Sequence, residues 1–493
     1  MADISTLHPE QRMLIDGELV FAASGKTFDN VNPATEEVLG SVTDAGPEDM
    51  HRAIAAARRA FDETDWSTNR SLRVRCLEQL QAALEAEREE LREQLILEAG
   101  CPRMLTYGPQ LDAPLNGVLP YQTKLVEEFA WETDLPDAPD FQGSLTARRV
   151  RKEPVGVVGA IVPWNFPFEV TITKVAQALA TGNTVVLKPA PDTPWNATLL
   201  ARVVAERTDI PAGVLNVVTS SDHLLGEELT LSPQVDLISF TGSTAVGRRI
   251  MEKGAATLKR LFLELGGKSA TVVLEDADFS TAMMMGLAVC THAGQGCAIP
   301  TRMLLPRSRY DEGVELLKGV LSSVPYGDPQ RPDVLMGPLI SAKQQARVLG
   351  YIEKGVAEGA TLAVGGGKPA AMDKGFFVEP TLFVDVDNAM TIAREEIFGP
   401  VLVVIAFEDD DDAVRIANDS NYGLGGAVFA GSLERAMAVA NRLRTGSVSV
   451  NGGMTYAPDL PFGGYKDSGI GRQNGVAGFD QYLEVKSLAW PAG

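Results

Sequence analysis

The 493-residue sequence predicts an α/β protein with two parallel-sheet domains and a small separate β element. From residue 155 onward, short apolar strands alternate with helices over brief connections, which is the pattern of a parallel sheet. A second series of the same kind follows residue 265. The length agrees with several domains, because roughly 150 residues per domain gives about three.

Helices are expected first along the chain. Apolar residues recur at helical spacing between residues 50 and 61, and a longer amphipathic stretch runs from residue 71 until the Gly-Cys-Pro sequence at 100–102 stops it. Residues 132–153 differ, because prolines and a glycine precede an alternating segment. That segment predicts an exposed β ribbon.

Two series of strands and helices then follow. The first is expected to place strands at 155–162, 184–187, 215–218, 237–240 and 261–265, with helices at 170–180 and 197–206. The second is expected to place strands at 271–274, 302–305, 401–407, 426–429 and 447–450, with helices at 310–323, 342–358 and 433–443.

The composition excludes several classes of partner. The formal net charge is −21, from 65 acidic and 44 basic residues, whereas nucleic acids and anionic membranes bind positively charged surfaces. The longest apolar runs are about half of a membrane span, and the N-terminus lacks the basic and apolar regions of a signal peptide. The four cysteines form no CxxC pair and the four histidines no metal-binding spacing, which predicts a cytoplasmic protein without zinc.

Cys297 is the first candidate catalytic residue. It ends the turn at 294–297, which follows an apolar stretch at 283–290. A thiolate is the best protein nucleophile near neutral pH, and a turn makes it reachable by a small molecule. A free cysteine is by default a small buried hydrophobe, so the local sequence leaves both interpretations open.

Glu264 is the second candidate, because it interrupts the apolar strand LFLEL just before a double glycine. Burying a carboxylate is costly unless it is paired or protonated. Glu264 is therefore either a glutamate paired with a lysine at a strand end or a general base with a raised pKa.

Three further segments follow strands at the sheet edge where parallel α/β proteins bind ligands. Asn165, in PWNFP, is either a helix cap or a donor to an oxyanion, and Lys188, in VVLKPA, is either solvated or ligand-binding. The loop TGSTAVG at 241–247 offers helix N-terminal amides to an anion, although its glycine spacing is a weak dinucleotide signal. EEIFGP and PFGGYK are each compatible with a simple turn.

Together and in this order, these segments resemble the NAD(P)-dependent aldehyde dehydrogenase superfamily over essentially the whole chain. The matching motifs are PWNFP, VVLKPA, PAGVLNVV, SFTGSTAVG, LELGGKS, GQGC, EEIFGPV and PFGGYKDSG. The resemblance implies a Rossmann-like NAD(P)-binding domain at 1–133 and 156–265, a catalytic domain at 266–480, and an oligomerisation element at 134–155 and 481–493. A homodimer or homotetramer is expected.

The resemblance also implies catalytic roles. Cys297 resembles the nucleophile that attacks an aldehyde to give a thiohemiacetal, and Asn165 with the backbone N–H of Cys297 resembles the oxyanion hole. Hydride transfer to the nicotinamide then leaves a thioester, and Glu264 resembles the base that activates water to hydrolyse it. Lys174 matches a lysine that the family keeps near the active site.

On the cofactor side, Lys188 resembles the ligand of the adenosine ribose, and Glu396 with Phe398 resembles the clamp on the nicotinamide ribose. The residues expected near the pyrophosphate are Trp164, Gly242 and Ser243. Pro191, followed by Asp192, stands where NAD-preferring relatives often carry a glutamate. NAD is the expected cofactor, and NADP is the alternative.

By similarity to the family, five residues should line the substrate tunnel: Val170, Thr291, Ile299, Met454 and Tyr456. That wall is mostly apolar and uncharged, so an aliphatic or aromatic aldehyde is expected rather than a phosphorylated or strongly anionic one. Cys290, His292 and Ile299 depart from the usual sequence around the nucleophile.

Three alternatives stay open. A coenzyme A-acylating semialdehyde dehydrogenase belongs to the same superfamily, but Glu264 counts against it. His292 and Cys297 would form a Cys-His hydrolase dyad that uses no nicotinamide, although a helix-end histidine is favoured. A catalytically silent relative is disfavoured because Cys297, Glu264 and Asn165 are all present.

Overall fold

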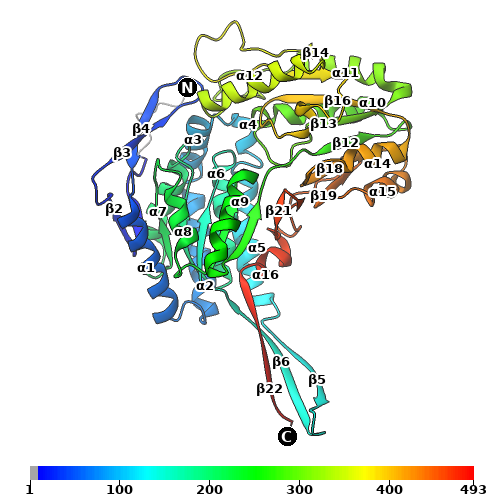
Figure 1. Ribbon diagram of the computed structural model, residues 1–493. Coiled ribbons are helices and arrows are strands. Elements are labelled where there is room, and N and C mark those ends of the chain that lie inside the picture. Colours follow the sequence, from blue (N-terminus) through cyan, green and yellow to red (C-terminus); the bar gives the residue numbers. More distant parts are fainter. Residues whose placement is uncertain (1–8, 493) are drawn as a thin grey trace.

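The computed structural model describes residues 9–492, which form two α/β domains and a protruding three-stranded ribbon (Figure 1). Residues 1–8 and Gly493 lie outside the described residues, and with them the N-terminal sequence that was compared with a signal peptide. The prediction of an α/β protein with two largely parallel sheets is confirmed.

The first sheet has eight strands in the order β2-β1-β9-β8-β7-β10-β11-β21. The five strands from β9 to β11 are parallel, and the outer strands pair antiparallel. In sheet order the bounds are Glu18–Val20, Met13–Ile15, Leu215–Val217, Thr184–Lys188, Val157–Ile161, Leu237–Thr241, Arg260–Glu264 and Gly469–Ile470.

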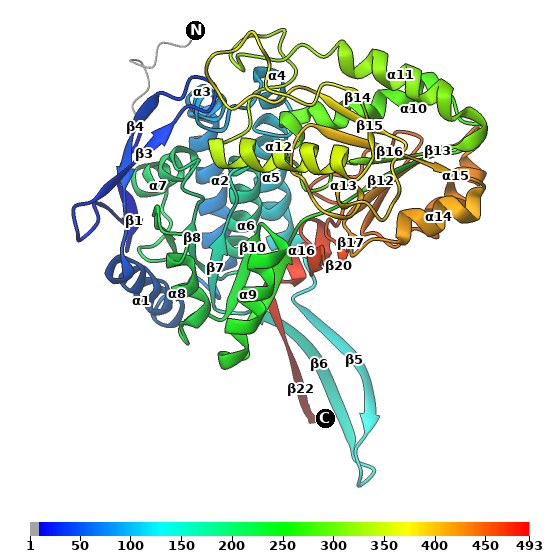
Figure 2. The ribbon, with the colours of Figure 1, turned by 45° about the horizontal axis from the view of Figure 1, so that its top comes forward.

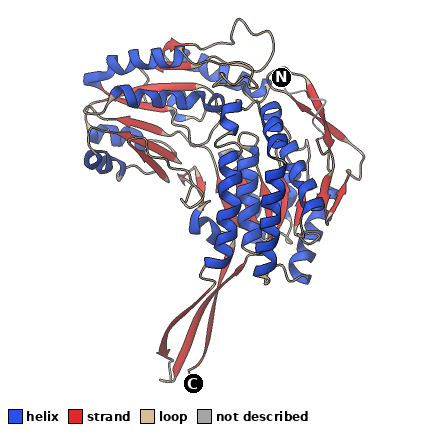
Figure 3. Ribbon diagram, turned by 180° about the vertical axis from the view of Figure 1, so that it is seen from behind, coloured by secondary structure: helices blue, strands red, loops and turns tan. Residues whose placement is uncertain are grey.

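Helices cover both faces of this sheet, because its strands are apolar on both sides. Along β10, Leu237 contributes to one core and Ile238 to the other. One face carries α1 (Pro47–Glu63), α8 (Leu225–Leu231) and α9 (Thr244–Gly254), followed by a short 3-10 turn (Ala255–Thr257). The other face, seen from behind in Figure 3, carries α2 (Arg70–Ala86), α3 (Arg88–Ala99), α5 (Asp112–Glu128), α6 (Pro167–Ala180) and α7 (Trp195–Arg207).

The second sheet has seven strands in the order β14-β15-β16-β13-β12-β18-β19, and only β14 is antiparallel. In sheet order the bounds are Thr361–Val364, Thr381–Val384, Val401–Phe407, Arg302–Pro306, Ala270–Val273, Gly425–Phe429 and Ser447–Val450. Its helical segments are α10 (Phe279–Met283), η3 (Met284–Gly294), η4 (Arg307–Arg309), α11 (Tyr310–Ser322), α12 (Ala342–Ala357), α13 (Thr391–Arg394), α14 (Asp410–Asn418) and α15 (Leu433–Ala440). Figure 2 shows α12 in front of the region where the two domains meet.

The ribbon pairs β5 (Glu132–Pro139) and β22 (Leu483–Pro491) with the two edges of β6 (Leu145–Pro154), and it extends away from both domains (Figure 1). The remaining elements are two small two-stranded sheets and two short helices: β3 (Thr27–Val31) with β4 (Val38–Thr43), β17 (Tyr422–Gly423) with β20 (Tyr465–Lys466), α4 (Arg103–Thr106) and α16 (Gly475–Asp480). No helix within residues 9–492 is long and apolar enough to cross a membrane.

Two differences from the sequence prediction concern the helical stretch after residue 71 and the segment that precedes the last strand. The amphipathic stretch from residue 71 is two helices that meet at Glu87, and Gly100, with φ 65°, ends the second of them. After leaving the second sheet, the chain returns to the first domain: β21 pairs with β11, and Phe479 of α16 packs in the core of the first domain. Residues 469–480 therefore lie with the first sheet, although the sequence assigned them to the second domain.

Candidate active site

The candidate site lies where strands β7, β8, β10 and β11 end, between the two domains. Two cavities adjoin there, with volumes of about 530 Å³ and about 550 Å³. They share Trp164, Gly242, Ser243, Lys343 and Gln344, so they form one continuous groove. This is the strand edge at which open α/β sheets bind ligands.

The turn that carries Cys297 is held by buried hydrogen bonds. His292 and Ala293 leave the helical conformation with φ of 48° and 53°. Gln295 then fixes the turn: its side chain donates to the carbonyl of His292 (3.0 Å) and accepts from the N–H of Ile340 (2.9 Å). Cys297 follows, half-buried in the wall of the 530 Å³ cavity.

Gly267 makes room for this turn. A side chain there would place its Cβ 2.4 Å from the carbonyl oxygen of Cys297. The double glycine after Glu264 therefore lets the end of the first sheet approach the nucleophile closely.

The surroundings of Cys297 favour the protonated thiol over the thiolate. Burial raises its pKa above the ordinary range, and the carboxyl groups of Glu264, Glu396 and Glu169 raise it further. The thiol must therefore lose its proton when it attacks.

Glu264 is the last residue of β11, and its side chain is almost fully buried in the same cavity. Neither carboxylate oxygen has a hydrogen-bond partner among the described residues. Burial raises the pKa of Glu264 to about 8, and the positive charges of Lys174 and Arg472 oppose this rise. An unpartnered carboxyl group with this pKa suits a general base and not a structural ion pair.

Asn165 also lines the cavity. Its side-chain Nδ2 donates to the backbone carbonyl of Gln295 (2.8 Å), and the backbone carbonyl of Asn165 accepts from Nε2 of Gln110 (2.8 Å). The amide nitrogen carries two hydrogens, so the contact with Gln295 leaves one for a ligand.

Lys174 stands behind the cavity and does not line it. Its Nζ donates to Oγ of Ser239 (3.1 Å) and lies 4.5 Å from the ring centre of Phe262. Burial lowers the pKa of Lys174 to about 8, while Glu264 and Glu169 raise it. Lys174 therefore acts on Glu264 through its charge.

The residues expected at the cofactor line the groove. Lys188 is buried in the 550 Å³ cavity near Pro191, Asp192 and His223, and burial lowers its pKa to about 8. Ser243 caps helix α9, whose free N-terminal amides face this cavity.

Glu396 and Phe398 lie at the other end of the groove. Glu396 accepts from the N–H of Gly267 (2.9 Å), and Phe398 stands edge-on to Trp164 with 5.4 Å between the ring centres. Arg347 and Gln344 of α12 donate to the carbonyls of Glu396 (2.6 Å) and Phe398 (2.8 Å). Helix α12 thus positions the segment 396–398.

The predicted substrate residues divide into two groups. Val170, Ile299 and Tyr456 line the 530 Å³ cavity, whereas Thr291 and Met454 do not. Met454 is 84% exposed, and its neighbour Thr455 faces the cavity instead. Thr291 directly precedes the two left-handed residues, which turn the chain at that point.

The sequence prediction missed several lining residues: Pro109, Phe166, Glu169, Thr455, Phe462 and Gln473. Glu169 corrects the expectation of an uncharged wall. The available signal was a charged residue in the otherwise apolar first turn of helix α6. Its partners cannot be read from that pattern.

The structure gives no support to a dyad of His292 and Cys297. His292 is fully buried, lies edge-on to Phe166 with 5.8 Å between the ring centres, and is not among the described residues that line the cavity. Burial lowers the pKa of His292 to about 4, which leaves the ring neutral and weakly basic.

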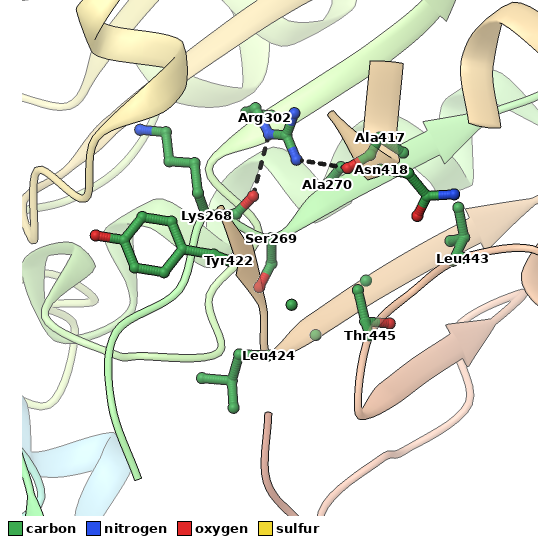
Figure 4. Close-up of a pocket in the computed structure, with 13 residues that line it drawn as sticks. Lys268, Ser269, Ala270, Arg302, Ala417, Asn418, Tyr422, Leu424, Leu443 and Thr445 are labelled. Atoms are coloured by element: carbon green, nitrogen blue, oxygen red, sulfur yellow. Dashed lines mark hydrogen bonds between the residues drawn. The ribbon is translucent and has the colours of Figure 1, made fainter. Parts of the chain in front are cut away.

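A much smaller pocket of about 10 Å³ lies at the start of β12 and has room for one water molecule (Figure 4). Arg302 donates there to the carbonyls of Lys268 (3.0 Å) and Ala417 (2.9 Å). The Lys268 side chain points away from Arg302 (Figure 4). Arg302, the first residue of β13, therefore ties the segment before β12 to the last turn of α14, which is a structural role. Within residues 9–492, no group of His, Cys, Asp or Glu could hold a metal ion.

Comparisons with known proteins cover nearly the whole chain. Residues 20–488 match the family model of the aldehyde dehydrogenase family. The 3-succinoylsemialdehyde-pyridine dehydrogenase of Pseudomonas sp. is 43% identical over 96% of this chain and 97% of its own length. The geranial dehydrogenase of Castellaniella defragrans is 42% identical over 97% of this chain and 98% of its own.

Solved structures similar to this chain are also aldehyde dehydrogenases. An aldehyde dehydrogenase of Mycobacterium tuberculosis complexed with NAD⁺ superposes with a TM-score of 0.94 at 41% identity, covering 99% of each chain. The betaine aldehyde dehydrogenase of Staphylococcus aureus in complex with NAD⁺ gives 0.95 at 36% identity, covering 99% of this chain and 96% of that one.

Proposed function

Because this chain belongs to the aldehyde dehydrogenase family, we propose that it oxidises an aldehyde to the carboxylic acid with NAD through a covalent Cys297 thioester. The observation that carries the mechanism is that Cys297, Asn165 and Glu264 line one cavity. Nucleophile, oxyanion donor and base are then within reach of one small substrate.

In the first step, the Cys297 sulfur bonds to the aldehyde carbon while the thiol proton passes to solvent water. Negative charge develops on the former carbonyl oxygen. The free N–H of Asn165 and the backbone N–H of Cys297 stabilise it, and such a donor contributes about 10²-fold to 10³-fold in rate. Bound NAD accepts the hydride of this carbon, which leaves the acyl group on sulfur as a thioester.

In the last step, Glu264 removes a proton from water as the water oxygen attacks the thioester carbon. The carbon–sulfur bond breaks, the leaving thiolate of Cys297 takes up a proton, and the acid is released. Neither oxygen of Glu264 has a hydrogen-bond partner among the described residues, so both are free to accept this proton. A base of this kind favours hydrolysis over transfer to coenzyme A.

The residues fit a dinucleotide. The 550 Å³ cavity offers the N-terminus of α9 for phosphate, Lys188 for a ribose, and an apolar wall that includes Val246 and Ile250. Asp192 lies beside Lys188 and supplies a carboxylate although Pro191 replaces the expected glutamate. This carboxylate would repel a 2′-phosphate, so we expect NAD to be preferred to NADP, which parallel kcat/KM measurements would test.

The test of the mechanism is product analysis. Hexanal with NAD should give NADH and hexanoic acid without coenzyme A, and Cys297→Ala should abolish both products. Cys290→Ala is the matched control, because it removes a buried thiol that does not line the cavity. Undiminished turnover by Cys297→Ala, or a strict requirement for coenzyme A, would refute the proposal.

We also propose a homodimer or homotetramer assembled through the ribbon. Both outer strands of the ribbon leave backbone groups open, and Phe141, Leu145, Val485 and Trp490 are exposed on it. Light scattering that gives a monomer mass would refute this.

We further propose a cytoplasmic location, which the four unpaired cysteines support. Cell fractionation would test it.

A further inference from the structure

Glu169 is, with Glu264 and Glu396, one of three carboxyl groups in the wall of the cavity into which Cys297 opens. It lies in the first turn of helix α6, is 7% exposed, and takes no part in the mechanism above. Its neighbour Val170 and Ile299, which lines the same cavity, are apolar.

Hydrogen bonds fix the position of Glu169. The hydroxyl groups of Tyr456 and Thr173 (3.2 Å) both donate to its Oε1. Tyr456 in turn accepts from Nε2 of Gln473 (3.0 Å). Both donors therefore act on one oxygen, and Oε2 accepts no hydrogen bond from residues 9–492. This leaves Oε2 to a ligand in the cavity.

Burial raises the pKa of Glu169, and no ion pair in the described part of the chain offsets the cost of charging this carboxyl group. The charge of Lys174 lowers the pKa of Glu169, but Lys174 donates its hydrogen bond to Ser239 and not to Glu169. A buried carboxylate without a paired cation is costly, and a cation brought by a ligand would offset that cost. Phe166, Phe462 and Tyr456 line the same cavity, and aromatic rings with a carboxylate are the usual surroundings of bound ammonium groups.

We propose that Glu169 is a specificity-determining residue that selects aldehydes carrying a positively charged nitrogen away from the carbonyl. It attracts that nitrogen through Oε2 and repels aldehydes that carry a carboxylate. Tyr456 is the positioning residue, because its hydroxyl holds the other oxygen. The inference rests on the proposed function, since it concerns the substrate of the same reaction.

The test uses two aldehydes of equal shape. In 4-(trimethylammonio)butanal a quaternary nitrogen occupies the place that a quaternary carbon has in 5,5-dimethylhexanal. In the wild-type enzyme kcat/KM should be higher for the cation than for its neutral isostere. Glu169→Gln should lower this ratio about 10-fold, because it removes a charged contact and keeps the side-chain shape. The anionic 4-oxobutanoate should gain in kcat/KM in the same variant.

Two further variants distinguish an effect of the Glu169 charge in the cavity from an unspecific effect of mutation. Glu434→Gln removes one negative charge from an exposed position on α15 and should leave the ratio unchanged. Tyr456→Phe keeps the ring and removes the hydroxyl that holds Glu169, so it should lower the ratio less than Glu169→Gln. A drop in the ratio with Glu434→Gln, or equal ratios in wild type and Glu169→Gln, would overturn the assignment.

A binding measurement covers the case in which Glu169→Gln folds poorly. Pentyltrimethylammonium ion should bind the Cys297→Ala protein in a calorimeter at least about 10-fold more tightly than it binds Cys297→Ala/Glu169→Gln. Equal affinity in two folded proteins overturns the proposal. The two proposals fail differently: no NADH from any aldehyde refutes the proposed function, whereas NADH formation without preference for the cation refutes only the role of Glu169.

Discussion

The proposed base makes turnover depend on pH, and Glu264→Gln should abolish that dependence. Burial raises the pKa of Glu264 to about 8, so the carboxyl group is mainly protonated and inactive as a base below this pH. In the wild-type enzyme, kcat should rise with pH and level off above about pH 8. Glutamine cannot accept a proton, so the variant should lack this rising limb.

The size of the expected change in kcat with pH follows from the pKa of Glu264. Two pH units below it, at about pH 6, roughly 1% of Glu264 is ionised, so kcat should be about 100-fold below its plateau. Glu264→Gln should lower the plateau by about 10²-fold to 10⁴-fold, the usual contribution of a general base. Acylation by Cys297 still forms NADH, so each active site should release about one NADH in a burst before turnover stalls.

The assay is stopped-flow NADH absorbance at saturating hexanal and NAD between about pH 6 and about pH 9.5. Intact-protein mass spectrometry of the stalled Glu264→Gln enzyme should show a hexanoyl adduct on Cys297. A pH-independent wild-type kcat, or a Glu264→Gln enzyme with more than about a tenth of wild-type turnover, would refute the assignment of Glu264 as the base.

The remaining predictions concern the neighbours of Cys297 and Glu264. Lys174→Met removes a charge that lowers the pKa of Glu264, so the rising limb of kcat should move to higher pH, whereas an unmoved limb would exclude electrostatic coupling. Asn165→Ala should lower kcat/KM for hexanal by about 10²-fold to 10³-fold, and a loss below about 3-fold would argue against an oxyanion contact. Gly267→Ala puts a Cβ 2.4 Å from the Cys297 carbonyl and should lower kcat about 10-fold or more, measured with the melting temperature. The control Gly319→Ala meets no atom within 4 Å in helix α11 and should stabilise the protein by up to about 1 kcal/mol.

Much of the fold is readable from local patterns. The periodic apolar residues after Pro47 form α1, and the strand predicted at 401–407 has the same bounds as β16. Such segments are predictable because a buried strand or an amphipathic helix repeats its apolar positions within a short window. The break at Glu87 was missed because polar residues surround it and neither glycine nor proline marks it.

The pairing of β21 with β11 was also beyond local reasoning. β21 is two residues long and lies in a glycine-rich segment that reads as a turn. Its place beside Glu264 depends on the chain returning from the second sheet to the first. No pattern within the segment carries that information.

The sequence by itself determined the family, the two parallel sheets and the residue types of the reaction, because each resides in a short motif or a local period. Tertiary structure alone decided which groups share the cavity. Tyr456 and Glu169 are 287 positions apart, yet they form one hydrogen bond, while the expected Met454 faces solvent. The physical reason is that burial, pKa and hydrogen-bond partners depend on the atoms that surround a side chain. For Glu169 and Glu264, those atoms come from segments that only folding brings together.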